Sequence, residues 1–369
     1  MSKIKSFIKS QPVLVIAFIA ALATVFIVPP DKEYSGYCNR TVLIQLFCLM
    51  TAVGGFRSIG VFEKITGFLM KSAGDLRRLG VIFTLICFFS SMLVTNDVAL
   101  ITFVPLTLMA YSRISDEKSR IFTVVLETAA ANLGSMITPF GNPQNLYIYD
   151  MYKLSTADFF RTMLPTGILS LLILLLLCML LPKTRCTAES SGNGKLSALH
   201  SGVYLGLFAV CLLAVFRVVP DWICLIAAVA TALILDRKLL LRVDYGLLAT
   251  FVCFFVFVGN IARIGAVREF FSSALESREV IVSALLSQVI SNVPAAVMLS
   301  GFTDNGTALL LGVNLGGLGT VIASLASLIS FQYYRNSEGA KPGRYMAVFS
   351  VVNFAMLAVL LVFVLLFPV

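Results

Sequence analysis

Long apolar segments, separated by short polar ones, follow one another along almost the entire chain. Nine of them can be distinguished, at residues 13–28, 41–56, 121–149, 163–182, 201–217, 221–236, 244–262, 307–331 and 345–368. Most have the length of about 20 residues that a helix needs to cross a hydrocarbon core of about 30 Å. A content of 59% hydrophobic and 13% charged residues also excludes a soluble globular enzyme. The sequence therefore predicts an all-α polytopic membrane protein with about nine transmembrane helices.

The distribution of basic residues predicts the orientation in the membrane. Lys3, Lys5 and Lys9 precede the first apolar segment, which we interpret as an uncleaved helix rather than a signal peptide. With the amino terminus in the cytoplasm, 20 of the 28 Lys and Arg residues lie on the cytoplasmic side, as the positive-inside rule requires. The carboxyl terminus is then external, and the expected location is a bacterial-type plasma (inner) membrane. Since topology accounts for the net charge of +9, no nucleic-acid partner is expected.

Two further apolar segments are interrupted by polar residues near the middle. Residues 81–110 contain Thr95-Asn96-Asp97, and residues 280–302 contain Ser291-Asn292. Each uninterrupted arm has at most about 14 residues, or about 21 Å of helix, which is too short for the hydrocarbon core. We therefore predict two re-entrant helical hairpins. Irregular backbone at membrane depth is tolerated only where it is buried in protein or lines a watery cavity, so the two tips are candidate sites.

The two halves of the chain match each other. Asn-Leu-Gly at 132–134, followed by Thr138, matches Asn-Leu-Gly at 314–316, followed by Thr320, and the two hairpin tips match as well. With the predicted topology, matched segments cross the membrane in opposite directions. We predict a first repeat over residues 1–182, a cytoplasmic linker over residues 183–200 and a second, inverted repeat over residues 201–369. Inverted repeats with broken helices near the midplane are typical of secondary transporters.

The hairpin tips and the broken segments carry the candidate binding groups. A helix that starts at a tip offers backbone N–H groups to an anion and carbonyls to a cation, although the same residues also serve as simple helix caps. Asp97 is costly at membrane depth unless it binds a proton, a cation or a partner. Glu127 either relays protons or hydrogen-bonds to a neighbour. Since the tips contain no Lys or Arg, amide dipoles and a co-bound cation must neutralise an anionic substrate.

Enzymatic activity has little support in the sequence. The single histidine, His200, lies in a polar loop, the eight cysteines form no CxxC pair, and no GxxxxGK[ST] phosphate-binding loop occurs. We expect a protein that is not an enzyme and needs no cofactor apart from a coupling ion. An intramembrane enzyme is the remote alternative.

The tips TNDVALITFVPLTL and SNVPAAVML, followed by NLGSMITPFGNPQN and NLGGLGTVIASLAS, resemble the ion transporter superfamily. Within it, the citrate-transporter-like anion permeases are most similar, over about residues 40–335. The resemblance implies an inverted repeat that works as an elevator, usually in a homodimer within the lipid bilayer. It also implies substrate contacts at paired tips and at the Gly/Pro/Asn loops, here Thr95, Asn96, Gly141, Asn142, Asn145, Ser291, Asn292 and Thr320.

The tips depart from the Ser-Asn-Thr sequence of the family's dicarboxylate carriers. They read Thr-Asn-Asp and Ser-Asn-Val, and the Asn-Asp tip is more similar to the arsenite-permease and sodium/proton-antiporter branches. We predict a secondary active transporter that moves a small anion, either a carboxylate or an inorganic oxyanion, coupled to Na⁺ or H⁺. The alternative is a Na⁺/H⁺ antiporter or an arsenite efflux permease. The expected coupling-ion residues are Asp97, Asn96, Asn292 and Glu127, with Na⁺ at the first three.

Overall fold

The computed structural model describes residues 11–70, 74–111, 114, 116–185 and 197–367. The basic amino-terminal tail and residues 186–196 of the predicted linker lie outside the described residues. Within the described ranges all regular secondary structure is helical, apart from one isolated bridge between Asp75 and Arg185. The helices are α2 (Pro12–Ile27), α3 (Tyr34–Tyr37), α4 (Arg40–Ser58), α5 (Val61–Met70), α6 (Leu76–Val94), α7 (Asn96–Tyr111), α8 (Glu117–Ser135), α9 (Pro143–Met151), α10 (Thr156–Cys178), α11 (Ala198–Val215), α12 (Asp221–Leu235), α13 (Lys238–Arg242), α14 (Tyr245–Ala262), α15 (Gly265–Leu275), α16 (Glu279–Ile290), α17 (Asn292–Leu299), α18 (Gly306–Leu315), the 3₁₀-helix η1 (Val321–Ala323), α19 (Leu325–Arg335) and α20 (Pro342–Leu366).

Six of the described helices are long and apolar enough to cross a membrane, namely α4, α6, α10, α11, α14 and α20. Large apolar side chains are exposed on several of them, for example Leu176 on α10 and Val351 on α20. Such side chains are suited to contact with lipid. The prediction of an all-helical membrane protein is therefore confirmed, whereas the number of nine crossings stays a prediction.

The first interrupted segment begins earlier than predicted. α6 starts at Leu76 and has 19 residues, so the prediction that each arm is too short to cross the membrane is wrong for this arm. The reason is local: Asp75 caps the helix by accepting a hydrogen bond from the N–H of Arg78, and Leu76 and Leu79 are buried. Arg77 and Arg78 interrupt the apolar pattern in the first turn, so this pattern did not reveal where the helix begins.

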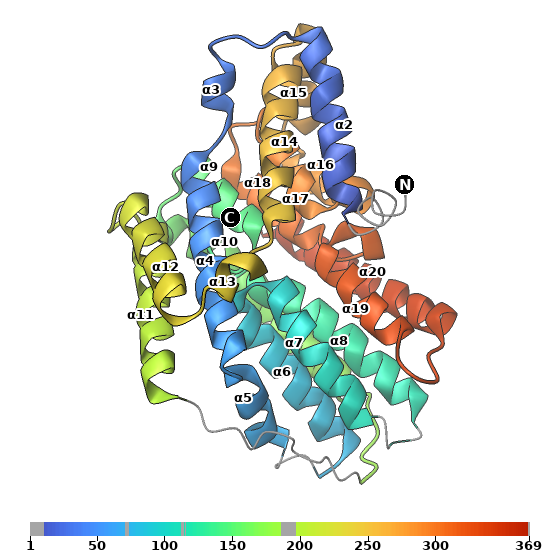
Figure 1. The fold of residues 1–369 in the computed structure, drawn as a ribbon. Helices are drawn as coiled ribbons and strands as arrows, with labels where there is room; N and C mark the ends of the chain where they lie inside the picture. Colours follow the sequence, from blue (N-terminus) through green and yellow to red (C-terminus); the bar gives the residue numbers. More distant parts are fainter. Residues whose placement is uncertain (1–10, 71–73, 112–113, 115, 186–196, 368–369) are drawn as a thin grey trace, which may run out of the picture.

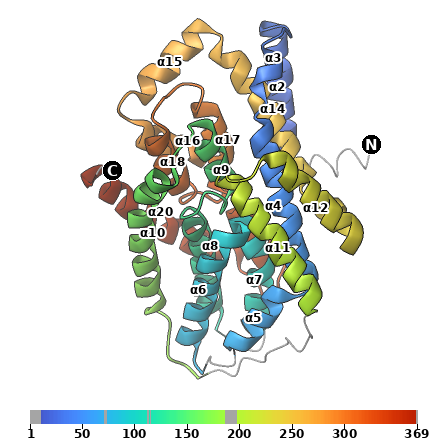
Figure 2. The ribbon, with the colours of Figure 1, turned by 90° about the vertical axis from the view of Figure 1, so that its left-hand side faces the viewer.

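Two pairs of helices extend toward the centre of the molecule from its opposite ends. In Figure 1, α6 and α7 lie in the lower part and α16 and α17 in the upper part, and Figure 2 agrees from the side. α8 packs against α6 and α7, while α18 packs against α16 and α17. α9 continues upward beyond α8, and α19 continues downward beyond α18 (Figure 1).

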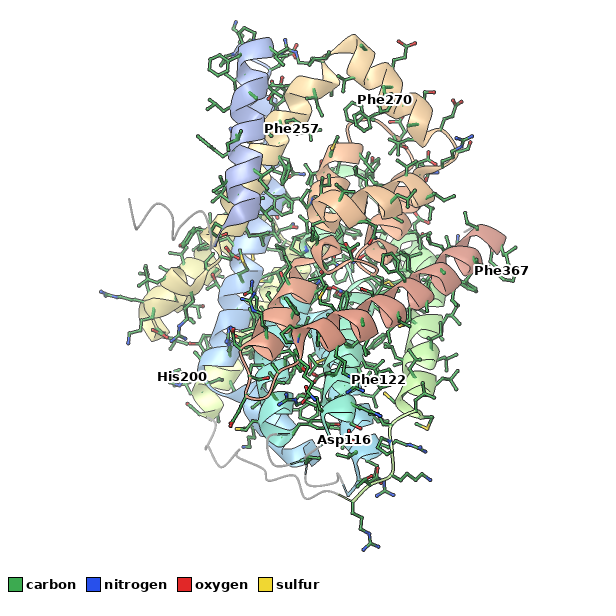
Figure 3. The ribbon with its side chains drawn as sticks, turned by 90° about the vertical axis from the view of Figure 1, so that its right-hand side faces the viewer. Asp116, Phe122, His200, Phe257, Phe270 and Phe367 are labelled. Atoms are coloured by element: carbon green, nitrogen blue, oxygen red, sulfur yellow. The ribbon has the colours of Figure 1, made fainter. Side chains whose placement is uncertain are left out.

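The remaining helices pack beside this central group. α4 contacts α11 and α12, and α2 contacts α14. Figure 3 shows the two ends of the molecule: Asp116, which caps α8, lies near the bottom, and the exposed Phe270 of α15 lies near the top. The breaks between α8 and α9, and between α18 and α19, are therefore far from both ends.

Candidate functional site

The helix pairs α6–α7 and α16–α17 turn with the same backbone conformation. Thr95 has φ 77° and ψ 152°, and Ser291 has φ 75° and ψ 154°. A positive φ is uncommon outside glycine and is an outlier for a β-branched residue. The asparagine that follows each turn accepts a hydrogen bond from the next backbone N–H, at 3.0 Å for Asn96 and 2.9 Å for Asn292. The two predicted tips therefore have the same strained geometry.

The loops that break the two neighbouring helices are attached to these turns in the same way. The hydroxyl of Thr138 donates to the carbonyl of Met92 at 2.6 Å, and the hydroxyl of Thr320 donates to the carbonyl of Gln288 at 3.0 Å. Met92 and Gln288 each lie three residues before their turn. Each loop is thus bonded to the end of its own helix pair.

Matched glycines allow the backbones to come close. A Cβ atom at Gly134 of α8 would overlap the carbonyl oxygen of Phe88 on α6. A Cβ atom at Gly316, just after α18, would stand 2.7 Å from Ser287 on α16. Because neither contact has room for a side chain, α8 and α18 are held at backbone distance from α6 and α16.

Asparagine side chains connect the first helix pair to the second broken helix. Asn96 donates to the Oδ1 atom of Asn132 at 3.0 Å, and Ser324 donates to the same oxygen at 3.0 Å. Since Ser324 precedes α19, the Asn132 amide joins the tip of α7, the last turn of α8 and the start of α19.

A second asparagine cluster joins the two breaks directly. Asn142 donates to Oδ1 of Asn314 at 3.0 Å, and Asn314 donates to Oδ1 of Asn145 at 2.6 Å. Asn145 in turn donates to the carbonyls of residues 135, 136 and 138, within the first break. Carbonyl groups that lack a partner within the broken helix thereby receive hydrogen bonds.

Gln288 has the corresponding role in the second break. Its amide donates to the carbonyls of Gly316 and Leu318 at 2.9 Å each, and its Oε1 accepts from the N–H of Thr320 at 2.8 Å. These contacts hold the loop, so Thr320 lies in the site's scaffold. Spacing alone did not reveal this role, because the bonded groups are about 30 residues apart.

A small cavity of about 10 Å³ lies where the two tips meet, with room for about one water molecule. Its polar lining residues are Asn96, Asp97, Gln144, Asn292 and Ser324. Asp97 is half-buried, and among the described residues its carboxylate has no hydrogen-bonding or ion-pairing partner. The cavity therefore offers oxygen and amide groups but, among the described lining residues, no Lys or Arg.

Most of the predicted site residues come together here, and one does not. Asn96, Asp97 and Asn292 line the cavity, and the remaining candidates form its turns and loops: Thr95, Gly141, Asn142, Asn145, Ser291 and Thr320. Glu127 is not among the residues that line it. Its Oε1 accepts from Thr107 at 2.5 Å, and its Oε2 is buried without a partner in the described structure.

A larger cavity of about 340 Å³ follows the same helices toward the upper end. It is lined by Tyr147 of α9 and by Val297 and Ser300 at the end of α17, together with residues of α3 and α14. Tyr147 and Ser300, which both line it, share a hydrogen bond of 2.7 Å. Tyr147 lies one turn beyond Gln144, and Val297 one turn beyond Val293, so both cavities lie along the contact between α9 and α17.

Comparison with known proteins identifies the family. The family model described as "Citrate transporter" matches residues 6–305. This chain belongs to the citrate transporter family. The resemblance inferred from the hairpin tips and broken helices is thereby confirmed.

Similar proteins are named as transporters or as membrane proteins. An uncharacterized transporter of Methanocaldococcus jannaschii is 30% identical over 87% of this chain and 88% of its own length. The inner membrane protein YbiR of Escherichia coli is 32% identical over 83% of each chain. The silicon efflux transporter LSI3 of Oryza sativa is 30% identical over 50% of this chain and 39% of its own length.

A solved transporter structure has a similar fold. The crystal structure of the Alcanivorax borkumensis YdaH transporter superimposes with a TM-score of 0.57 and covers 90% of this chain and 85% of its own. Because the sequence identity is 13%, this likeness concerns the fold alone. The family and its relatives identify the chain as a membrane transporter.

Proposed function

We propose that this protein is a secondary active transporter that moves a small anion, a carboxylate or an inorganic oxyanion, across the plasma membrane, coupled to Na⁺ or H⁺. The observation that carries the proposal is the cavity between the two turns, which contains one carboxylate and, among the described residues, no basic side chain. An anion entering such a place is repelled by Asp97 until a cation or a proton neutralises that group. Substrate binding and cation binding are therefore linked at one site.

The proposed architecture is an inverted repeat with two re-entrant hairpins and about nine crossings, with a cytoplasmic amino terminus and an external carboxyl terminus. Its support is the equivalence of the contacts at Thr95 and Ser291, combined with the approach of the two helix pairs from opposite ends (Figure 1). In such an arrangement, a change that opens one side has a symmetry-related counterpart that opens the other. We further propose a homodimer, on the family resemblance.

Asp97 is the proposed coupling group, with Asn96 and Asn292 as additional oxygen ligands if the ion is Na⁺. Carboxylate and amide oxygens are suitable ligands for a hard cation, and all three side chains line the same small cavity. Glu127 is the proposed second proton-carrying residue, since one of its oxygens is buried and unpaired.

Proteoliposomes loaded with a pH dye test this proposal. Na⁺ is added alone and then with citrate, succinate, phosphate or arsenite, for the wild type, Asp97→Asn and the control Asp158→Asn, which alters an exposed carboxylate at the start of α10. We expect a signal that requires one anion and is lost in Asp97→Asn but retained in Asp158→Asn. Wild-type cation dependence in Asp97→Asn would contradict the assignment.

Exchange of an oxyacid or of Na⁺ for protons is the second candidate function. The cavity, which is rich in hydrogen-bond acceptors and has no Lys or Arg among its described lining residues, and the relative named a silicon efflux transporter favour it. If Na⁺ alone drives proton efflux in the same liposomes, the protein is a Na⁺/H⁺ antiporter. If an arsenite gradient alone drives proton movement, it is an oxyacid exchanger.

A further inference from the structure

The cavity between the turns is lined unequally by the two halves of the chain. Counting from Asn132 and Asn314, the residues that precede α9 and α19 correspond, Asn142 to Ser324. By the same count Gln144 corresponds to Ala326, and from the turns Asp97 corresponds to Val293. The unmatched polar groups, Gln144 and Asp97, are thus both supplied by the first half. At these two positions the two halves of the chain therefore present different hydrogen-bonding groups to the cavity.

Gln144 differs from the other amides of the site in having an unused oxygen. Its side chain is 1% exposed, and no donor within the described structure reaches its Oε1. The amide oxygens of Asn132, Asn142, Asn145 and Asn314 all accept hydrogen bonds. Buried polar atoms are nearly always paired, so an unpaired one in a residue that lines a cavity points to a ligand.

The chemistry of an amide oxygen defines the matching group. This oxygen accepts hydrogen bonds and cannot donate one, and Asp97, which also lines the cavity, is likewise only an acceptor when ionised. A fully ionised carboxylate or oxyanion brings only further acceptors, whereas a hydroxyl brings a hydrogen. The space available, about that of one water molecule, suits a single hydroxyl group.

We propose that Gln144 determines substrate specificity by accepting a hydrogen bond from a hydroxyl group of the transported solute, which is either a hydroxycarboxylate or an undissociated oxyacid. This inference rests on the transport function proposed above. The larger cavity lies along the same helix, where Tyr147 is one turn away from Gln144.

Pairs of solutes that differ by one hydroxyl test this directly. Uptake and competition are measured in proteoliposomes for malate against succinate, citrate against tricarballylate, and for silicic and arsenous acid as undissociated oxyacids. The variant is Gln144→Met, which keeps the length of the side chain and removes the acceptor. The control is Gln45→Met, the same change at a residue that is 4% exposed and hydrogen-bonded to Ala214 and Asp221, away from the cavity.

We expect the wild type and Gln45→Met to prefer the hydroxylated member of a pair by about 5- to 150-fold, the range for leaving one buried acceptor unpaired. Gln144→Met should lose this preference and take up both members at similar rates. If the oxyacids are the substrates, Gln144→Met should lower their uptake by a similar factor relative to Gln45→Met.

The outcomes separate the two proposals. A wild type that transports no probe under any Na⁺ or H⁺ gradient refutes the transport function, and this inference with it. Transport without hydroxyl preference, or a preference that persists in Gln144→Met, overturns the role of Gln144 alone. A change confined to Na⁺ affinity in Gln144→Met also overturns it, because the amide oxygen would then be a cation ligand.

Discussion

Replacing Asn314 by leucine should destabilise the protein strongly, because this side chain joins the two broken helices. Asn314 is 2% exposed; it donates to Asn145 and to the carbonyl of Leu310, and it accepts from Asn142. Leucine has a similar volume, so Asn314→Leu removes three hydrogen bonds without opening a large cavity.

The magnitude follows from the groups left behind. Oδ1 of Asn145 loses this bond, the carbonyl of Leu310 loses one donor, and Nδ2 of Asn142 retains only its longer bond of 3.3 Å to Ser135. A buried group left unpaired costs about 1–3 kcal/mol, whereas hydrogen bonds between membrane helices average about 0.6 kcal/mol. We therefore expect a loss of about 2–6 kcal/mol in the free energy of unfolding.

The assay is unfolding in detergent, followed by circular dichroism, with Asn353→Leu as the matched control. Asn353 is also fully buried, but its Nδ2 bonds only to Phe349 of its own helix and its Oδ1 has no partner in the described structure. Asn353→Leu should be neutral or stabilising because it removes an unpaired oxygen. Equal effects of the two substitutions would refute the reasoning, since burial alone would then explain them.

Three further predictions concern other contacts. Gly134→Ala should cost about 1–3 kcal/mol in the free energy of unfolding, because its Cβ overlaps Phe88, while Gly206→Ala, with open space around its Cβ, should be neutral or stabilising in the same assay. Tyr147→Phe removes the hydrogen bond to Ser300 and should speed backbone amide hydrogen exchange in α17 about 5-fold, which corresponds to a loss of ~1 kcal/mol in the free energy of local opening. An unchanged exchange rate would contradict this contribution of the hydrogen bond. Arg263 donates to Asp31 at 2.7 Å and lowers the pKa of that carboxyl, so the contact is present at neutral pH and is lost as the pH falls below the ordinary carboxyl range of about 4. Limited proteolysis of residues 28–33 should therefore increase on acidification in the wild type but be independent of pH in Arg263→Gln.

The sequence predicted the membrane fold and the position of both turns, because these depend on local properties. Apolar runs identify helices that lie in a membrane, and Thr95-Asn96 and Ser291-Asn292 interrupt such runs. The start of α6 was missed because Arg77 and Arg78 interrupt its apolar pattern in the first turn.

The contacts within the site depend on chain segments that are far apart, and spacing along the sequence does not reveal them. Asn142 and Asn314 are 172 residues apart, and Ser324 and Asn132 are 192 apart. Ser324 could have been found by extending the match between the halves, since it occupies the position of Asn142. The unpaired oxygen of Gln144 has no signature in the sequence, because whether a partner is present depends on packing.

The hydrogen bonds between Asn142, Asn314 and Asn145 also have a consequence for biogenesis. The first half is synthesised and inserted before Asn314, so Asn142 and Asn145 lie within the membrane without this partner until the second half is inserted. Such a half should be a target for membrane proteases or insertion chaperones until the second half arrives. Expression of the two halves as separate chains, divided within residues 186–196, should then yield each half in stable form only when the other is present.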